Sequence, residues 1–348
     1  MLALNTVPNL HTELDQSSVD MAQRFAPDNI SDQPTTRAIT ADQTNQSIVI
    51  DEAVVVKWLR PPLPVTKFQD VVLRHLRHVG FVDMPTFYGT SVVDGLVTAI
   101  VTEFIPDAVD GWDWCVAELT TELDAGSIEG ALRSAGQMGT LTGRLHQSLA
   151  QSSEWLVAPT GSSGLDREFD RGIALLTEAS DVTVGQPGQR LRARSGSIRS
   201  ALDALIHAPA LPTQLIHSDL HVGQFLRSPT RLAVNDFDGN PVNPDTSRRS
   251  PMIDLAGLLQ SIDHVARVVT NRRPDLQNQA TNYIDRAQRS ALLAYSAERP
   301  CTADELEILW SLRVLQELHE FVYAARSLPR WLYVPDASLT GLFPMDDS

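Results

Sequence analysis

The stretch "LIHSDLHVGQFLRSPTRLAVNDFDGNP", Leu215 to Pro241, places six polar side chains between apolar runs. These side chains are His217, Asp219, His221, Gln224, Asp236 and Asp238. "LIH" and "QFL" flank a polar turn, and "RLAVND" has the pattern of a strand that leads into a second turn. Carboxylates on two adjacent turns can converge on one spot. We therefore predict a loop followed by a hairpin, with the two turns contributing to one site.

The size and composition of the chain predict a globular protein with two lobes, since 348 residues with 43% hydrophobic content can form two cores. No apolar run approaches the roughly 20 residues that a membrane-spanning helix needs. The first residues lack the basic start and apolar core of a signal peptide, so we expect a cytoplasmic protein. Cys115 and Cys301 have no CxxC partner and are expected to pack in the core.

The formal net charge of −15 argues against nucleic acid or an anionic membrane as a partner, because both require clustered positive charge. A neutral or cationic small ligand fits this charge better. Lys57 and Lys67 are the two lysines of the chain, and every other basic residue apart from histidine is an arginine. The position of each lysine is therefore informative.

The residues before Pro106 predict a small lobe rich in strands. Residues 1–40 are polar and form an expected N-terminal cap with one short helix in "SSVDMAQRFA". "QSIVIDEAVVVKWLR" predicts a hairpin that carries Lys57 on its second strand, which "PPLP" ends. A helix over 66–80 and a second hairpin, "TFYGTSVV" with "LVTAIVTEFIP", complete the lobe.

The residues after Pro106 have apolar side chains at helical spacing and predict a larger helical lobe. Helices are expected at 110–123, 129–150, 165–179, 190–208, 251–270, 282–298 and 303–328, with "TVGQPGQ" as a surface loop. The predicted class is α+β with a bilobal arrangement. Its predicted parts are the cap at 1–40, a small lobe rich in strands at 41–105, and a helical lobe at 106–348.

The polar residues between Leu215 and Pro241, together with Lys57, match the requirements of phosphoryl transfer. A carboxylate must orient the attacking hydroxyl, and hard oxygen ligands must hold Mg²⁺ on the nucleotide phosphates. Asp219 suits the first role and Gln224 with Asp236 the second, while Lys57 can supply a point charge to the phosphates. A single HxD or DxD is more often a solvated turn. The combination with a lysine on a strand and a change from strands to helices favours function.

"HSDLHVGQFL" resembles the HxDxxxxN motif of the aminoglycoside phosphotransferases and the protein-kinase-like fold, with Gln224 in place of asparagine. "HSDLHVGQ" and "DFDGNP" are more similar still to the catalytic and metal loops of the actinobacterial maltokinases and the related glucosamine kinases. "VTEFIPDAVDGWDW", "RRSPMIDLAGLLQSIDH" and "YAARSLPRWL" match further segments of this group. The resemblance covers most of the chain from about Asp42 onward.

The resemblance implies a kinase fold with ATP between the lobes. The lobe at 41–105 would then bind the nucleotide, and the lobe at 106–348 would carry the catalytic loop, the metal loop and the acceptor site. The expected cofactor is Mg²⁺, with two ions bound. Peptide groups near Glu103 to Ile105 would bind adenine, and a turn at Asn45 to Ser47 would cover the phosphates. Such kinases pair the strand lysine with a helix glutamate. The helix at 66–80 has no glutamate, and Asp70 is the nearest acidic candidate.

The histidines have competing interpretations. By the resemblance His217 braces the catalytic loop, while His221 either touches phosphates or packs. His146, in "GRLHQSLA", is expected to be a satisfied core or interlobe histidine. A histidine-based zinc site is disfavoured because no HxxxH or HxH with a third ligand occurs.

The acceptor is predicted to lie against Asp219 and to be held by the helix at 303–328. Gln316, Glu320 and Tyr323 share one face of that helix, and Trp331 follows it. Such a stripe is more often solvated, but by the resemblance this helix faces the acceptor sugar. An acidic pocket that includes Asp238 and Glu320 favours a protonated amine.

D-glucosamine, giving the 6-phosphate, is therefore the preferred acceptor. Maltose, phosphorylated at its anomeric hydroxyl, is the second candidate, and an aminoglycoside is the third. A kinase-like module that binds ATP without catalysis is the alternative from a different functional class. The oligomeric state is not predicted.

Overall fold

The computed structural model describes residues 9–39, 45–64, 68–158, 161–239 and 247–344 of the chain. It divides into two compact units. The sheet unit comprises residues 1–109, 152–157 and 226–238, and the helical unit comprises 110–151, 158–225 and 239–348. The mixed class predicted from the sequence, with a sheet lobe and a helical lobe, is confirmed. The boundaries at 40 and 105 stay a prediction.

The sheet unit contains a five-stranded antiparallel sheet in the order β1-β2-β3-β5-β4. Its strands are β1 (Thr36–Ile39), β2 (Gln46–Ile50), β3 (Val54–Pro64), β4 (Phe87–Val93) and β5 (Leu96–Glu103). Its helices are α1 (Asn9–Phe25) and α2 (Phe68–His78), with a 3₁₀ turn, η1 (Pro27–Asn29), after α1. Both predicted hairpins and the helix between them are confirmed.

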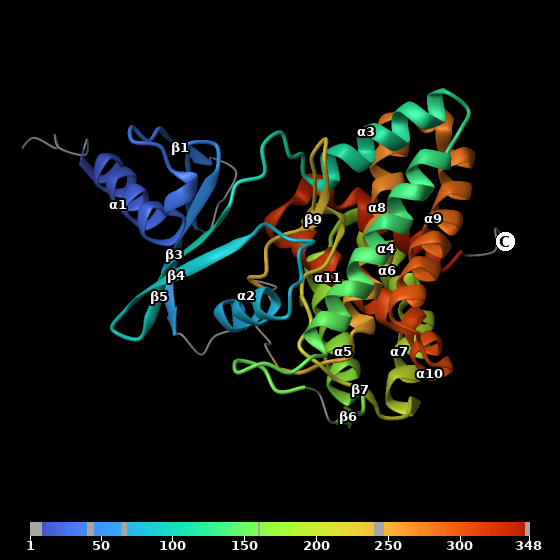
Figure 1. Ribbon diagram of the computed structural model, residues 1–348. Coiled ribbons are helices and arrows are strands. Elements are labelled where there is room, and N and C mark those ends of the chain that lie inside the picture. Colours follow the sequence, from blue (N-terminus) through green and yellow to red (C-terminus); the bar gives the residue numbers. More distant parts are fainter. Residues whose placement is uncertain (1–8, 40–44, 65–67, 159–160, 240–246, 345–348) are drawn as a thin grey trace, which may run out of the picture. The chain divides into compact units, whose positions relative to one another are not determined.

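The core of the sheet unit shows on which face of the sheet Lys57 lies. Ile48, Val56 and Val101 pack in one cluster with Ala22 of α1, which lies against the sheet (Figure 1). Successive side chains of a strand point to opposite faces. Lys57 follows Val56 and therefore lies on the face that α1 does not cover.

The turn of the first hairpin also follows its sequence. Asp51 and Glu52 both have positive φ, 51° and 50°, which suits a two-residue hairpin turn with the right-handed twist of the strands. The Asp51 carboxylate accepts hydrogen bonds from the backbone N–H groups of Ser31 and Thr35, each 2.8 Å. The turn thereby holds the segment that leads from α1 into β1.

The prediction that "PPLP" ends the strand is wrong. β3 continues to Pro64, with a register shift between Trp58 and Leu63. Among the described residues, β2 pairs with β3 as far as Trp58, and the last residues of β3 pair with β5. A proline without an N–H group is tolerated on such an edge.

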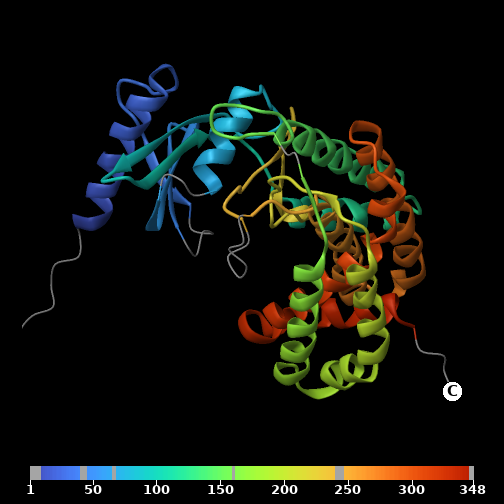
Figure 2. The same cartoon turned by 90° about the horizontal axis from the view of Figure 1, so that it is seen from below.

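The helical unit is built around α8 (Met252–Arg272), which is buried over most of its length. The other helices of this unit are α3 (Gly111–Asp124), α4 (Glu129–Leu149), α5 (Asp166–Val182), α6 (Gly185–Ala193), α7 (Ser195–His207), α9 (Gln277–Glu298), α10 (Ala303–Glu307), α11 (Leu309–Ser327) and α12 (Tyr333–Leu342). α4 and α9 pack side by side (Figure 1). α5, α6 and α7 form one group, yellow-green in Figure 2, against which α11 packs.

Short elements complete the chain. The strands are β6 (Ser162–Ser163), β7 (Leu211–Pro212), β8 (Phe225–Arg227) and β9 (Leu232–Val234), and the 3₁₀ turns are η2 (Val222–Gln224), η3 (Pro274–Leu276) and η4 (Pro329–Trp331). β8 and β9 form the predicted hairpin after the first polar turn. None of the helices in the described ranges is long and apolar enough to cross a membrane.

Three predictions about the helical unit are wrong. "TVGQPGQ" is not a surface loop, because most of it forms α6, and the helices expected at 190–208 and 303–328 are each divided in two. Arg190 of α6 pairs with Asp336 of α12. Arg192 donates to the carbonyl groups of Ser180 and Thr183. These tertiary contacts stabilise a helix that its glycines and proline disfavour.

Candidate functional site

The loop that carries Asp219 lies directly on the backbone of two helices. A Cβ atom at Gly111, the first residue of α3, would overlap the carbonyl group of Val222. A Cβ atom at Gly257 of α8 would lie 2.5 Å from the carbonyl oxygen of Leu220. Only glycine permits such close approach. Both helices therefore begin at this loop, and their glycines fix its depth in the unit.

Asp254, in the first turn of α8, holds the backbone just before Asp219. Its carboxylate accepts hydrogen bonds from the N–H groups of His217 at 2.6 Å and Ser218 at 2.9 Å. Ser218 has φ of +71°, a left-handed conformation that costs energy for a residue with a side chain. The two hydrogen bonds stabilise this conformation, which sets the direction of the Asp219 side chain.

His146 of α4 supports Asp254 from behind. Its Nε2 lies 3.0 Å from the Asp254 carboxylate and its Nδ1 lies 2.9 Å from the hydroxyl of Tyr295. Burial lowers the pKa of His146, which is fully buried, against the opposing effect of Asp254. A neutral imidazole that donates from Nε2 satisfies both partners. The prediction that His146 is a satisfied core histidine is confirmed.

His221 and Gln224 shape the rest of the loop. His221 Nδ1 accepts a hydrogen bond from the N–H group of Gly223 at 3.0 Å and so caps the turn η2. Its ring lies 5.7 Å from the ring of Trp112. Gln224 is buried and donates toward the carbonyl oxygen of Asp219 at 3.4 Å. His221 thus packs and caps, while its contact with phosphates stays a prediction.

A cavity of about 840 Å³ opens beside Asp219, and all its lining residues belong to the helical unit. The lining residues come from the loop and from three helices. They are Asp219 and His221 of the loop; Gln316, His319, Glu320 and Tyr323 of α11; Trp112, Asp113, Val116, Ala117, Thr120 and Thr121 of α3; Gly257, Ser261, His264, Val268 and Arg272 of α8; and Leu328 with Trp331. Three of the four predicted acceptor residues, Gln316, Glu320 and Trp331, therefore lie together with Asp219. The fourth, Asp238, does not line this cavity and belongs to the sheet unit.

The Glu320 carboxyl group is affected by two other carboxylates, Glu317 and Asp219. Burial raises the pKa of this carboxyl group, the charge of His264 opposes the shift, and the charges of Glu317 and Asp219 add to it. Gln316 donates to Glu320 at 3.3 Å. A cation bound in this cavity would relieve the repulsion between the carboxylates, since like charges in a partly desolvated space interact strongly.

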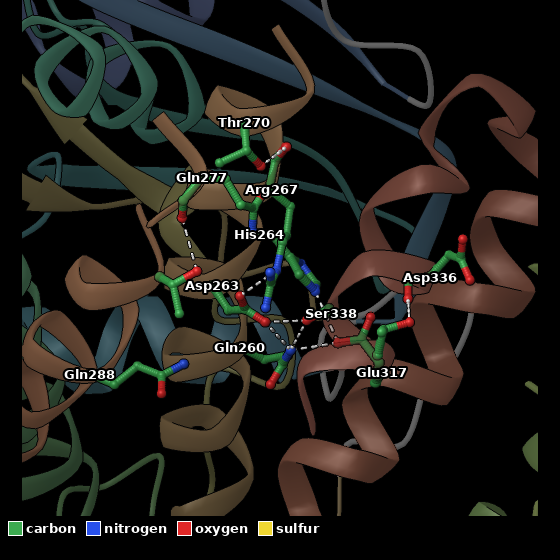
Figure 3. Close-up of polar contacts among 12 residues, drawn as sticks. Gln260, Asp263, His264, Arg267, Thr270, Gln277, Gln288, Glu317, Asp336 and Ser338 are labelled. Atoms are coloured by element: carbon green, nitrogen blue, oxygen red, sulfur yellow. Dashed lines mark hydrogen bonds and ion pairs between the residues drawn. The ribbon is translucent and has the colours of Figure 1, made fainter. Parts of the chain in front are cut away.

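A buried polar network forms the wall behind the cavity, between α8, α11 and α12 (Figure 3). Gln260 donates to Glu317 at 2.5 Å and to Ser338 at 2.6 Å, and Ser338 donates to Asp263. His264 Nε2 lies 3.1 Å from Glu317. Burial lowers the pKa of His264, but the charge and hydrogen bond of Glu317 outweigh this effect and raise it to about 9. His264 is therefore a cation at neutral pH.

We expect His264 to make the protein less stable as the pH rises from 6.5 to 9. Its pKa is raised on folding, so its contribution to stability is complete below about 6.5 and is lost as the pH passes 9. The slope from one proton is at most about 1.4 kcal/mol per pH unit. His146 and His319 have lowered pKa values, so they oppose this decline just above pH 6.5 and are neutral in both states above about pH 7.5. Urea denaturation at several pH values measures the slope.

The matched comparison is between His264→Gln and His207→Gln, a surface histidine of the same unit. The first substitution should flatten the decline between pH 6.5 and 9, and the second should leave it unchanged. An equally steep decline in both variants would show that His264 is not the group responsible.

The sheet unit brings Lys57 together with two of the predicted aspartates. Lys57 Nζ lies 3.1 Å from Asp236 and 2.6 Å from Asp238. Gln69 of α2 and the side chain of Asn45 also donate to Asp238. Burial and the Asp236 carboxylate raise the pKa of Asp238 to about 6, and the charge of Lys57 opposes them. Asp236 has φ of +61°, a conformation that aspartate tolerates in turns.

Asp70, suggested as the partner of Lys57, has other partners. It forms an ion pair with Arg74 at 2.9 Å, one turn later in α2, and accepts a hydrogen bond from Thr90 at 2.8 Å. This suggestion was wrong because an arginine four residues away is a nearer partner on the helix surface. The partners of Lys57 are instead the aspartates of the predicted metal loop.

The segment predicted to bind adenine is held within the sheet unit. The N–H groups of Glu103 and Phe104 donate to the carbonyl groups of Thr86 and Ala53, each at 2.8 Å. The Glu103 side chain pairs with Arg231 at 2.6 Å. No backbone carbonyl among the described residues accepts the N–H group of Ile105.

The turn predicted at Asn45 to Ser47 is mostly strand. Ser47 lies in β2 opposite Lys57, and Asn45 precedes the strand. Residues 40–44 lie outside the described residues.

The donor types fit Mg²⁺ as it occurs with nucleotides. Such an ion is usually held by one or two carboxylates, with phosphate oxygens and water completing its shell. Asp236 and Asp238 supply carboxylates at one place, and Gln224 supplies a side-chain oxygen in the helical unit. Among the described residues there is no cluster of three or more histidine, cysteine or acidic side chains for a metal. A shared ion at Gln224 and Asp236 stays a prediction.

Sequence reasoning missed the roles of Asp254, Trp112 and His264. "PMIDLAG" contains an aspartate in a helix's first turn, where it can accept backbone N–H groups. Nothing in a single sequence shows that those groups belong to a loop 36 residues earlier. Trp112 lies in the acidic, tryptophan-containing segment quoted above, and only the fold places its ring beside His221.

The fold and the loops at Asp219 and Asp236 define a phosphotransferase with a kinase-like architecture. Residues 35–292 match the model of the phosphotransferase enzyme family, and the chain belongs to this family. The relatives narrow the class further. The chain is 39% identical to a glucosamine kinase from Streptacidiphilus jiangxiensis, over 88% of this chain and 73% of that protein.

Two further comparisons agree. The chain is 35% identical to a glucosamine kinase from Mycolicibacterium smegmatis, over 88% of this chain and 79% of that protein. A solved structure of a glucosamine kinase in complex with glucosamine, ADP and inorganic phosphate superposes with a TM-score of 0.76 at 34% identity, covering 89% of this chain and 82% of that one. The resemblance to the glucosamine kinase group is confirmed.

Proposed function

We propose that the protein transfers the γ-phosphate of ATP to D-glucosamine and forms glucosamine 6-phosphate. The observation that carries this proposal is the acidic cavity beside Asp219, in a chain that shares 35–39% identity with glucosamine kinases. The carboxylates of Asp219 and Glu320 favour a protonated amine over a neutral sugar such as maltose. Because its donor is ATP, we also expect the protein to act in the cytoplasm.

The residues of the helical unit would act on the acceptor. Asp219 would accept or orient the proton of the attacking hydroxyl. Glu320 would pair with the ammonium group, Gln316 would bind a neighbouring hydroxyl, and the Trp331 ring would pack on the sugar. The hydrogen bonds from His217 and Ser218 to Asp254 would keep the base in place during turnover.

The residues of the sheet unit would act on the nucleotide. Ile105 would donate its N–H group to adenine, and Asn45 with Ser47 would lie near the phosphates. In the structure, Lys57 pairs with Asp236 and Asp238. On nucleotide binding its ammonium would be shared with the phosphates, and the two aspartates with Gln224 would hold Mg²⁺. The cation would neutralise charge on the transferred phosphoryl group.

A panel of sugars tests this proposal, with ATP, MgCl₂ and an assay for ADP release. Glucosamine should give the highest kcat/KM, and glucose, which lacks the amine, should be at least tenfold poorer. Phosphorus NMR should place the product phosphate on O6. Strong turnover of maltose without turnover of glucosamine would replace glucosamine by the second candidate. Nucleotide binding without turnover of any acceptor, aminoglycosides included, would favour a binding module.

A further inference from the structure

The cavity beside Asp219 is much longer than one sugar ring. Its floor is one face of α8, formed by Gly257, Ser261, His264, Val268 and Arg272. These residues span 15 positions (272 − 257), which is about 22 Å along a helix that rises 1.5 Å per residue. One pyranose ring is about four bonds of roughly 1.5 Å across, or about 6 Å. A single glucosamine molecule would therefore leave most of the floor uncovered.

The two ends of this floor differ in chemistry. At the end near Gly257 the catalytic loop supplies Asp219 and α11 supplies Glu320, so this end is acidic. α3 also starts at that loop, and its last residues in the cavity lining are Thr120 and Thr121. The end far from the loop is thus formed by threonines, Val268 and Arg272. We name this end the distal subsite.

The side chains of the distal subsite can bind hydroxyl groups. The hydroxyls of Thr120 and Thr121 donate to the carbonyl groups of Val116 and Ala117, at 2.7 and 2.8 Å. Their oxygen lone pairs therefore remain able to accept hydrogen bonds from a ligand. Val116 and Val268 provide apolar surface between them. This mixture of hydroxyl and apolar groups is typical of a sugar-binding surface.

Arg272 adds a positive charge to the distal subsite. In the described part of the chain no ion pair or hydrogen bond holds its guanidinium group. The next residue, Arg273, does not line the cavity and pairs with Asp124 and Asp275, each at 2.8 Å. A guanidinium group without a carboxylate partner, in a chain of net charge −15, can donate to ligand oxygens. It would disfavour a second amine.

We infer that the distal subsite binds a second sugar ring without positive charge, and that the protein accepts amino-disaccharides as well as free glucosamine. The reacting ring would carry the amine, at the acidic end beside Asp219. The second ring would lie over Val268 and receive hydrogen bonds from Arg272. This inference rests on the proposed function, since it takes Asp219 as the base and Glu320 as the partner of the amine.

The test compares free glucosamine with three disaccharides as acceptors: glucosaminyl-β-1,4-glucose, glucosyl-β-1,4-glucosamine and the doubly cationic glucosamine dimer. At least one neutral-ring disaccharide should be phosphorylated on its glucosamine ring with kcat/KM at or above that of glucosamine. The dimer should be at least fivefold poorer than that disaccharide. If the neutral-ring disaccharides are neither substrates nor competitive inhibitors while glucosamine is turned over, the inference is wrong and the proposed function stands.

Substitutions in the distal subsite provide a second test, in which the acceptors stay the same and the protein is changed. Arg272→Ala should lower kcat/KM for the disaccharide at least tenfold and change that for glucosamine less than twofold. Arg273→Ala is the matched control and should alter neither. Ala117→Trp fills the subsite from an exposed position of α3 and should also abolish only the disaccharide reaction. Equal losses for both acceptors would overturn the inference, and turnover of maltose alone would overturn both proposals.

Discussion

Replacing Asp219 with asparagine is expected to lower kcat for glucosamine phosphorylation about 10³-fold, within the range of general-base catalysis. This loss corresponds to about 4 kcal/mol of the barrier. An amide matches the shape of the carboxylate but cannot take a proton from the acceptor hydroxyl. The KM for glucosamine should rise by a smaller factor than kcat falls, because the Asp219 charge is one of two that attract the protonated amine and Glu320 remains. Steady-state kinetics with both substrates measure these values.

The control for this variant is Asp181→Asn, which removes an exposed carboxylate near the end of α5 in the same unit. It should retain the activity of the original protein. If Asp219→Asn kept activity within about tenfold, a change of only ~1.4 kcal/mol in the barrier, Asp219 would not be the base. The loop at His217 to Gln224 would then need another role.

Local chemistry predicted the small lobe well, because its signals lie within a few residues of one another. The turn at Asp51 and Glu52 joins two β-branched runs, and Asp94 with Gly95 joins the next two strands. The place of Lys57 on a strand followed directly from this pattern. Its partners did not, because Asp236 and Asp238 come about 180 residues later in the chain.

Long-range contacts explain the elements that the sequence did not predict. β1 was missed because Thr36–Ile39 is short and half polar, and it forms a strand by pairing with β2. α6 was read as a loop because of Gly185, Pro187 and Gly188, and it is held by Asp336 from α12. In both cases tertiary contacts outweighed local propensity.

The candidate site was likewise predicted where its signals are local and missed where it depends on contacts between distant segments. The types of group needed for phosphoryl transfer were recognisable because the motif around Asp219 is local. The cavity was only partly predictable: the helical spacing placed Gln316, Glu320 and Tyr323 on one face, and they do line it together. The α3 and α8 walls, and the charge of His264 behind them, depend on the packing of separate helices.

Asp254→Asn is expected to reduce kcat about 10²-fold, although Asp254 need not touch either substrate. The asparagine oxygen can accept both the Nε2 hydrogen of His146 and the N–H group of His217, which share one carboxylate oxygen, and this places the amide hydrogens against the N–H group of Ser218. A buried donor without an acceptor costs about 1–3 kcal/mol. The smallest backbone change that separates these donors is for Ser218 to leave its left-handed conformation. This change would turn the Asp219 side chain away from the acceptor hydroxyl.

A purely structural role would give a different result, and three readouts separate the two. If Asp254 positions the base, kcat should fall while KM for ATP and glucosamine changes less than threefold, in protein that urea denaturation shows to be folded. Tyr295→Phe removes only the hydrogen bond to His146 Nδ1, one step farther from the loop, and should cost less than tenfold. Asp254→Glu should restore part of kcat, since a carboxylate can again accept both N–H groups. Full activity of folded Asp254→Asn protein would show that the backbone at Ser218 is held without this carboxylate.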